Sequence, residues 1–366
     1  MPTVSEIAAY LESFAPSATA AEWDNVGLLL GDPATPVQRV LTCLTLTPDV
    51  AAEAIRDEAQ LIVTHHPILF RGVKKLTANT PDGQVVWPLA QAGVAVYSPH
   101  TAYDNSRGGI NDQLCQRLGL TRTTPLRPRE GKRQCKLVVF VPDSDLAKVS
   151  NAVFAAGAGV IGEYNECSFR VAGTGTFFGT EAANPVVGQK GRREEVPEWR
   201  LEVVVPEAQV AAVVAAMRAA HSYEEPAFDV YPLRPMASGG EGRIGVLESP
   251  TTLGELARQV QQVLAANTVQ VVGDLSRRVG TVAVACGAAG EFVRDALAQQ
   301  ADVFLTGEVR FHEALTARSA GMGLIVPGHY ATERPAMEAL AMQLATQFPD
   351  LSVWASRVER DPFTRI

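Results

Sequence analysis

The stretch Leu61-Ile-Val-Thr-His-His-Pro-Ile68 decides the expected fold. Its first three residues are apolar and two of them are β-branched, which predicts a short buried strand. The strand runs through Thr64 into two adjacent histidines, His65 and His66, and Pro67 prevents a regular continuation. Two imidazoles at the end of a buried strand can hold metal at a fixed place.

The segments before this stretch predict a parallel sheet. Residues 40–46 are expected to form a strand, and residues 48–59 a helix that begins after Thr47 as its N-cap. Together with the strand at 61–64 they form a βαβ unit, whose right-handed crossover makes the two strands parallel. The two histidines then lie at the carboxyl end of the sheet, where open α/β sheets bind their ligands.

Two other predicted strands end in residues of the same chemical kinds. The strand at 94–98 is followed by His100 and Asp104, and the strand at 322–326 by His329 and Glu333. The last two are four residues apart, on one face of a helical turn. With the two histidines of the first strand, this gives imidazoles and carboxylates suited to two divalent cations such as zinc, iron, manganese or nickel. Adjacent side chains diverge, so His65 and His66 are expected to serve different metal ions.

Composition sets the class of protein. The chain has 366 residues, which favours two domains, and 46% hydrophobic with 20% charged residues is typical of a globular protein. The net charge of −8 argues against broad nucleic-acid binding. The N-terminus lacks a signal-peptide pattern, no apolar run is long enough to span a membrane, and the five cysteines are scattered. We therefore expect a cytoplasmic protein with free thiols.

The middle of the chain is interpreted as an inserted domain. Residues 121–133 and 234–242 are polar and rich in Pro, Gly or charge, and they are interpreted as linkers. Between them the pattern predicts two β-α-β units, which is typical of a ferredoxin-like module. The predicted elements are strands at 135–141, 169–178, 199–205 and 228–233, with helices at 144–156 and 206–221.

Several further motifs have an ordinary structural explanation. Gly157, Gly159 and Gly162 match G-x-G-x-x-G but follow a helix, so they are interpreted as turn glycines and not as a dinucleotide site. The segment 286–290 (CGAAG) joins a strand to a helix and is favoured as a tight turn over a phosphate site. The loop 23–25 (WDN) fits either an Asx-stabilised loop or the rim of a site, and the sequence leaves both open.

Five motifs in this order and spacing resemble the Nif-three-like family, whose members are often labelled GTP cyclohydrolase I type 2 homologs. They are WDNVGLLLG (23–31), THHPILF (64–70), HTAYDN (100–105), TGEVRFHEAL (306–315) and GHYATE (328–333). The resemblance covers essentially the whole chain. It implies an α/β Nif-three-like domain with mainly parallel sheets flanked by helices, formed by residues 1–126 and 237–366. It also implies an inserted PII/CutA-like α+β domain at 127–236 and assembly into a homohexamer.

The resemblance also implies a ligand set for two divalent cations. The resemblance assigns one ion to His65, Asp104 and Glu333. It assigns the other ion to His66, His329 and Glu333, so that Glu333 bridges the two ions. The family often has TGD where this chain has Thr306-Gly-Glu308.

Two functions remain open at this stage. The first is a metal-dependent hydrolase of a small substrate, with nucleotide or phosphate groups among the candidates, in which His100, His312 and Glu308 are candidates for proton transfer or for orienting a ligand. Each of these histidines could equally serve as a hydrogen-bonding neighbour of the site. The second function is a non-enzymatic metal-binding or regulatory assembly that stores or delivers metal or binds a partner protein.

Overall fold

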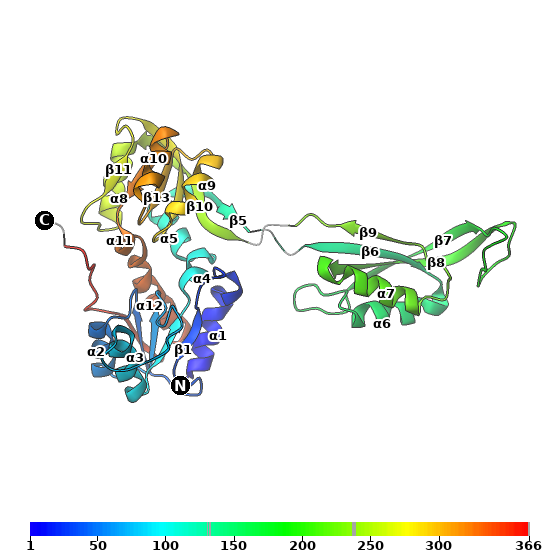
Figure 1. Ribbon diagram of the computed structural model, residues 1–366, viewed down its shortest axis with the longest axis horizontal. Helices are drawn as coiled ribbons and strands as arrows, with labels where there is room; N and C mark the ends of the chain where they lie inside the picture. Colours follow the sequence, from blue (N-terminus) through cyan, green and yellow to red (C-terminus); the bar gives the residue numbers. More distant parts are fainter. Residues whose placement is uncertain (130, 132, 236–238, 365–366) are drawn as a thin grey trace. The chain divides into compact units, whose positions relative to one another are not determined.

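The computed structural model describes residues 1–129, 131, 133–235 and 239–364. The chain divides into two compact units (Figure 1). The main unit comprises Met1–Arg129 and Gly239–Ile366, and the inserted unit comprises Glu130–Ser238. In the described residues no helix is long and apolar enough to cross a membrane.

The first sheet of the main unit is largely parallel. Its strand order is β1-β4-β3-β2-β15, in which only the β1–β4 pair is antiparallel. The bounds are β1 Gly27–Leu30, β2 Arg39–Cys43, β3 Leu61–Thr64, β4 Ala95–Ser98 and β15 Ser352–Ala355. The predicted βαβ unit is therefore present, with β2 and β3 parallel.

Both faces of this sheet are buried because successive side chains of a strand point to opposite sides. Leu41 and Ile62 pack with helices α2 (Pro48–Arg56) and α3 (Pro81–Ala92). Their neighbours Val40, Leu61 and Val63 belong to a second core with α1 (Val4–Phe14) and α12 (Pro335–Gln347) (Figure 1). Burial on both sides explains why the strands read as continuous apolar runs.

The second sheet of the main unit is mixed, so the expectation of mainly parallel sheets is wrong for it. Its order is β11-β14-β13-β12-β10-β5, and only β12–β13 and β13–β14 are parallel pairs. The strands are β5 Leu120–Pro128, β10 Gly240–Thr252, β11 Gln270–Val272, β12 Arg278–Ala285, β13 Val303–Thr306 and β14 Gly323–Val326. The helices α5 Ile110–Arg117, α8 Leu253–Val263, α9 Val293–Ala298 and α10 Phe311–Ser319 accompany it.

The predicted linkers are wrong where they overlap β5 and β10. These strands pair antiparallel, with Glu241 opposite Arg127 and Gly240 opposite Pro128. Strand β5 lies at the edge of the sheet, where a proline's missing N–H is tolerated, and its one fully buried side chain is Leu126. The amino-acid composition of these strand ends therefore resembles that of a linker. The predicted linker residues 130, 132 and 236–238 lie outside the described residues.

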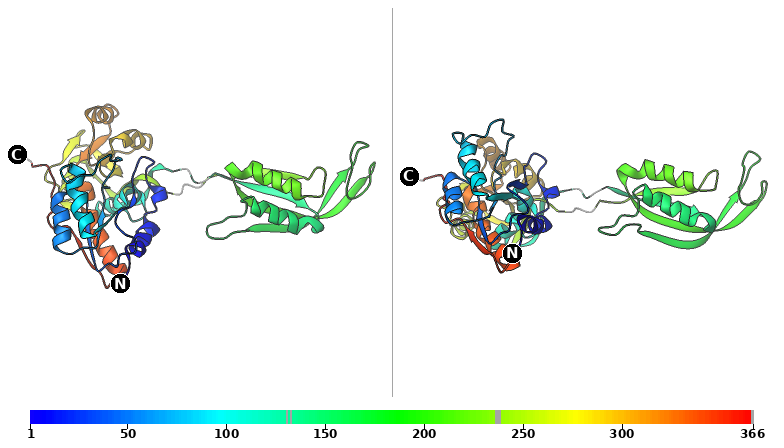
Figure 2. Two further views of the ribbon diagram at one scale, coloured as in Figure 1. Left: turned by 60° about the horizontal axis from the view of Figure 1, so that its bottom comes forward. Right: turned by 90° about the horizontal axis from the view of Figure 1, so that it is seen from below.

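The inserted unit has the predicted β-α-β-β-α-β order. Its antiparallel sheet runs β7-β8-β6-β9, and both helices pack on one face of it (Figure 2). The elements are β6 Gln134–Val141, α6 Leu146–Ala155, β7 Ser168–Phe178, β8 Arg193–Pro206, α7 Val210–Ala220 and β9 Phe228–Pro232. Short 3₁₀ turns in the described residues of both units lie at Ser17–Thr19, Asp143–Asp145, Glu207–Gln209 and Gly290–Phe292.

Candidate metal centre

Strand β3 fixes the two adjacent histidines. Its parallel pairing with β2 continues past the strand end, because His65 N–H donates to Cys43 O (2.9 Å) and His66 N–H donates to Leu44 O (2.8 Å). The hydroxyl of Ser98, at the end of β4, donates to His65 O at 2.7 Å. Both histidine backbones are therefore held by the sheet and not by a mobile loop.

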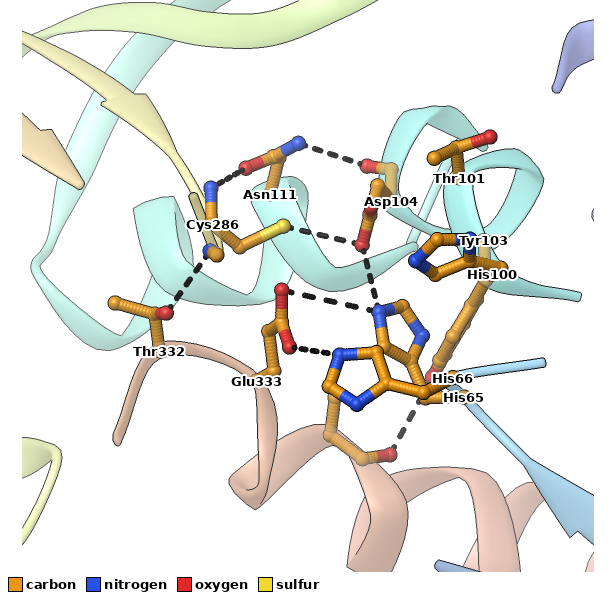
Figure 3. A network of polar contacts seen from close by, with 12 residues as sticks. His65, His66, His100, Thr101, Tyr103, Asp104, Asn111, Cys286, Thr332 and Glu333 are labelled. Carbon is orange, nitrogen blue, oxygen red and sulfur yellow. Dashed lines mark hydrogen bonds and ion pairs between the residues drawn. The ribbon is translucent and has the colours of Figure 1, made fainter. Parts of the chain in front are cut away.

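The imidazole ring of His65 is buried. Its side chain is 0% exposed, and neither ring nitrogen has a hydrogen-bond partner among the described residues. Nε2 faces two carboxylates, at 3.5 Å from Asp104 Oδ1 and 3.8 Å from Glu333 Oε1 (Figure 3). Burial lowers the pKa of His65 despite the opposing effect of Glu333, so its ring is neutral. A buried unpaired imidazole is costly, and a cation between Nε2 and the carboxylates would satisfy it.

His66, His329 and Glu333 form a second group that shares the same carboxylate. Glu333 Oε2 lies 3.0 Å from Nε2 of His66 and 3.0 Å from Nε2 of His329, and the two Nε2 atoms are 3.2 Å apart. Each ring is oriented through its other nitrogen: Thr45 Oγ1 contacts His66 Nδ1 at 2.7 Å, and Glu308 Oε1 contacts His329 Nδ1 at 3.0 Å. Such partners commonly orient metal-binding imidazoles.

Burial and the charged neighbours of this group set its ionisation. Burial opposes a charge on His329, but the hydrogen bond and charge of Glu333, with those of Glu308, outweigh burial and raise its pKa to about 9. Burial likewise opposes ionisation of Glu333, yet His65, His329 and His66 outweigh it and hold its pKa below the usual value. The site is thus built to bind positive charge.

Glu333 reaches both groups from the short helix α11 (His329–Glu333), where it is one turn away from His329. The loop after β12 leaves room for its carboxylate. Gly287 has φ +64°, and a Cβ there would overlap Glu333 Oε1 and lie 3.4 Å from His329 Nε2. Only glycine suits both the conformation and the close approach.

Asp104 is held by a network that the sequence did not reveal. It lies on a short helix, α4 (His100–Asn105), where only a segment following a strand was expected. Cys286 Sγ is 3.1 Å from Asp104 Oδ1, and Asn111 donates to Asp104 O (3.0 Å) while accepting from Cys286 N–H (2.9 Å) (Figure 3). Burial, then Asp104 and Glu333, raise the pKa of Cys286, so it is a thiol donor.

The charge of Asp104 itself depends on its neighbours. Burial and the nearby carboxylate of Glu333 raise its pKa, although His100 and Cys286 oppose this. Two carboxylates in one buried site repel each other. A divalent cation between them would relieve this repulsion.

His100, predicted as a proton carrier, lies close enough to His65 and His66 to be a metal ligand as well. Its ring centroid is 5.1 Å from that of His65, and His65, His66 and His100 form a third group with metal-ligand spacing. Nδ1 is 2.7 Å from Asp24 Oδ1, and Asp24 raises the pKa of His100 against the effect of burial. The residue has φ +29°, an uncommon conformation for a non-glycine residue that often marks a functional position.

Asp24 also resolves the two interpretations of the 23–25 loop. It accepts hydrogen bonds from Asn25 N–H (2.8 Å), Thr101 N–H (3.1 Å) and Thr101 Oγ1 (2.5 Å). The loop is therefore stabilised by Asx hydrogen bonds and also borders the site.

His312 lies elsewhere. It is exposed at the start of α10, where its ring meets that of Phe311, and in the described part of the chain it takes no part in the hydrogen bonds or ion pairs of the centre. Glu308, in contrast, contacts His329 directly.

Two groups share Glu333. The ligand atoms of His65, Asp104 and Glu333 lie within 4.8 Å of one another, as do those of His66, His329 and Glu333. The donor types, the shared carboxylate and the unpartnered ring of His65 all fit a metal ion. Nothing in the sequence indicated the roles of Thr45, Asn111 and Cys286, because a lone polar residue after a strand or in a helix has many ordinary explanations.

The matches to known proteins cover almost the whole chain. The family model of Duf34/NIF3 (NGG1p interacting factor 3) matches residues 2–362. A Halalkalibacterium halodurans protein named GTP cyclohydrolase 1 type 2 homolog is 40% identical over 97% of this chain and 96% of its own, and a Bacillus subtilis protein of that name is 37% identical over 98% and 97%. A solved Bacillus cereus protein related to NIF3 is 35% identical, with a TM-score of 0.71 over 100% of this chain and 99% of its own. The resemblance inferred from the motifs is confirmed, and the chain belongs to the Duf34/NIF3 family.

Proposed function

We propose that the centre binds two divalent cations that share Glu333, and that the protein hydrolyses a small molecule there. The observation that carries the proposal is His65. Its two ring nitrogens are buried and have no hydrogen-bond partner in the described part of the chain, while Nε2 faces Asp104 and Glu333. His65 and Asp104 would hold one ion, and His66 and His329 the other. When bound, two such ions polarise a water molecule and the oxygen atoms of the bond that is cleaved.

The protein groups around the ions have separate tasks. Thr45 and Glu308 hold the rings of His66 and His329 in position. His100, anchored through Nδ1 by Asp24, is placed to carry a proton on Nε2. The relatives named GTP cyclohydrolase 1 type 2 homolog suggest that GTP belongs among the substrates to be tried.

Metal analysis combined with a substrate screen tests the proposal. Natively purified protein should contain about two divalent ions per chain by plasma mass spectrometry. It should also hydrolyse at least one member of a panel of nucleotides, phosphoesters and cyclic amides. Glu333→Gln should lose metal and activity together. Glu58→Gln, which changes an exposed glutamate in a surface ion pair, should lose neither.

The outcomes separate two functions. Protein that contains no metal and binds none when offered zinc, iron or manganese would overturn the centre itself. Metal-loaded protein without turnover on the panel would contradict the hydrolase and favour metal storage, delivery or regulation.

We further propose that the inserted unit is a PII/CutA-like assembly module and that the chain forms a hexamer. Support comes from its element order and from edge strand β7, which is exposed along most of its length. An exposed edge strand can pair with another copy. Light scattering on the full chain should give a hexamer, and a monomer would contradict this proposal.

A further inference from the structure

Glu359 is a buried carboxylate near the C-terminus that contacts the end of β2. Its oxygens accept hydrogen bonds from Leu44 N–H at 3.0 Å and from Thr45 N–H at 2.6 Å. Both N–H groups lie past Cys43, the last residue of β2, so they belong to no strand. Glu359 is 6% exposed, and it forms an ion pair of 2.8 Å with Nε of Arg334. The positions of residues 44 and 45 therefore depend on this carboxylate.

Leu44 and Thr45 are also the residues that hold His66. Leu44 O accepts a hydrogen bond from His66 N–H at 2.8 Å, and Thr45 Oγ1 contacts His66 Nδ1 at 2.7 Å. When Nδ1–H donates to this hydroxyl, Nε2 keeps its lone pair, and Nε2 is the atom that lies 3.0 Å from Glu333 Oε2 (Figure 3). Glu359 thus acts on His66 through two separate contacts, one on its backbone and one on its ring.

His65 is positioned by other groups. Its N–H donates to Cys43 O at 2.9 Å, and its carbonyl accepts from the hydroxyl of Ser98 at 2.7 Å. Neither of these contacts involves Glu359. Although the two histidines are adjacent in the sequence, His65 depends on the sheet itself, and His66 depends on a residue from the C-terminal end of the chain.

Glu359 belongs to a C-terminal turn (residues 356–359) that is itself anchored. Ser356 N–H donates to Thr42 O at 2.8 Å, which continues the pairing of β15 with β2. The hydroxyl of Ser356 donates to Glu53 Oε2 at 2.6 Å and accepts from Glu359 N–H at 3.2 Å. Because the turn is fixed, its carboxylate is a defined support for residues 44 and 45.

We propose that Glu359 is a positioning residue for His66, so that the C-terminal turn governs the ion held by His66 and leaves the ion held by His65 unaffected. The inference rests on the proposed function, because it takes the centre to hold two ions. It deepens that function by making the two sites separately adjustable.

Variants that keep one ion each test the proposal. His65→Ala keeps the ion held by His66, and His66→Ala keeps the ion held by His65. The zinc affinity of the full-length proteins is measured by competition with a chromophoric chelator, with and without Glu359→Gln. The amide nitrogen of glutamine cannot accept a hydrogen bond, so one of the two N–H groups loses its partner.

The effect of Glu359→Gln should differ between the two backgrounds. Zinc binding should weaken about tenfold or more in His65→Ala, as when a neighbour that orients a ligand is lost. It should change by less than about twofold in His66→Ala, where the substitution acts on an independent site. Equal weakening in both backgrounds, or an unchanged affinity in His65→Ala, would overturn the proposal.

Asp302→Asn is a matched control. Asp302 accepts hydrogen bonds from Gly280 N–H and Thr281 N–H at 2.9 Å each and forms an ion pair of 3.4 Å with Arg277, so it makes the same kinds of contact in the second sheet. Its substitution should lower stability without a difference between the two backgrounds. If Glu359→Gln does not fold, Glu359→Asp, which keeps the charge on a side chain one methylene shorter, decides the question.

A second measurement reads His66 without zinc. Metal-free protein is treated with diethyl pyrocarbonate, which acylates imidazole, and each histidine is followed by mass spectrometry. Glu359→Gln should make His66 react faster, because its ring is released from Thr45, while His312 outside the centre should keep its rate. Wild-type protein that binds no zinc would contradict the proposed function, and faster acylation of His66 would still support its positioning by Glu359. Zinc binding with unchanged acylation of His66 would contradict the positioning alone.

Discussion

Replacing Gly287 by alanine should displace the carboxylate that the two halves of the metal centre share. The added Cβ would overlap Glu333 Oε1 and lie 3.3 Å from its Cδ. The backbone cannot easily move away, because Gly287 N–H donates to Thr332 Oγ1 (3.1 Å) and Gly287 O accepts from Thr306 Oγ1 (3.2 Å) and Glu308 N–H (3.0 Å). The side chain of Glu333 must therefore rotate, so that its Oε1 no longer faces His65.

The expected size of the effect has two parts. Alanine at φ +64° costs about 1–2 kcal/mol of folding free energy through backbone strain. Loss of a neighbour that merely orients a ligand weakens metal binding about 10–100-fold, so displacement of the shared ligand itself should weaken it by at least about 100-fold.

Gly321→Ala separates the two parts. Gly321 has φ +75°, and no atom of the described residues lies within 4 Å of an added Cβ, so it shares the strain without the clash. Zinc affinity is measured by competition with a chromophoric chelator, and stability by urea unfolding of the metal-free proteins. Both variants should lose similar stability, but only Gly287→Ala should lose zinc affinity. Equal zinc affinity and stoichiometry in the two variants would refute the reasoning.

Three further predictions concern the surroundings of the centre. Glu308→Gln removes the charge that orients His329 and should weaken zinc binding about 10–100-fold in the chelator assay, and an unchanged affinity would contradict that role. Glu359→Gln removes one of the two carboxylates that pair with the buried Arg334, the other being Glu338 at 2.6 Å, and should lower the free energy of unfolding by about 1–3 kcal/mol in urea, whereas an unchanged stability would show the Glu359 ion pair to be dispensable. Because His329, with its pKa raised to about 9, must lose a proton to bind metal, zinc affinity should rise by up to about tenfold per pH unit between about pH 7 and 9 and then level off. Protonation of His329 also stabilises the metal-free fold. This contribution is fully present below the pKa of an unfolded histidine, near 6.5, and is lost as the pH rises through 9. Zinc binding that does not change with pH would refute the assignment.

Local patterns in the sequence determined much of the main unit and the candidate ligands. The apolar run of β3 and the helix after β2 are readable because each has its own periodicity, and the parallel βαβ rule then places His65 and His66 at a definite edge of the sheet. The spacing of His329 and Glu333 placed both on one helical turn. Such inferences depend on residues that are neighbours along the chain.

Tertiary structure alone decided the features that depend on distant segments. Strands β5 and β10 look like linkers until they pair with each other, and their antiparallel pairs, with that of β11 and β14, make the sheet mixed. The contact of Cys286 with Asp104 joins residues 182 positions apart, and Glu359 reaches Thr45 across 314 positions. The physical reason is that a polar side chain acquires its role from the partner that packing brings to it, and no local period encodes that partner.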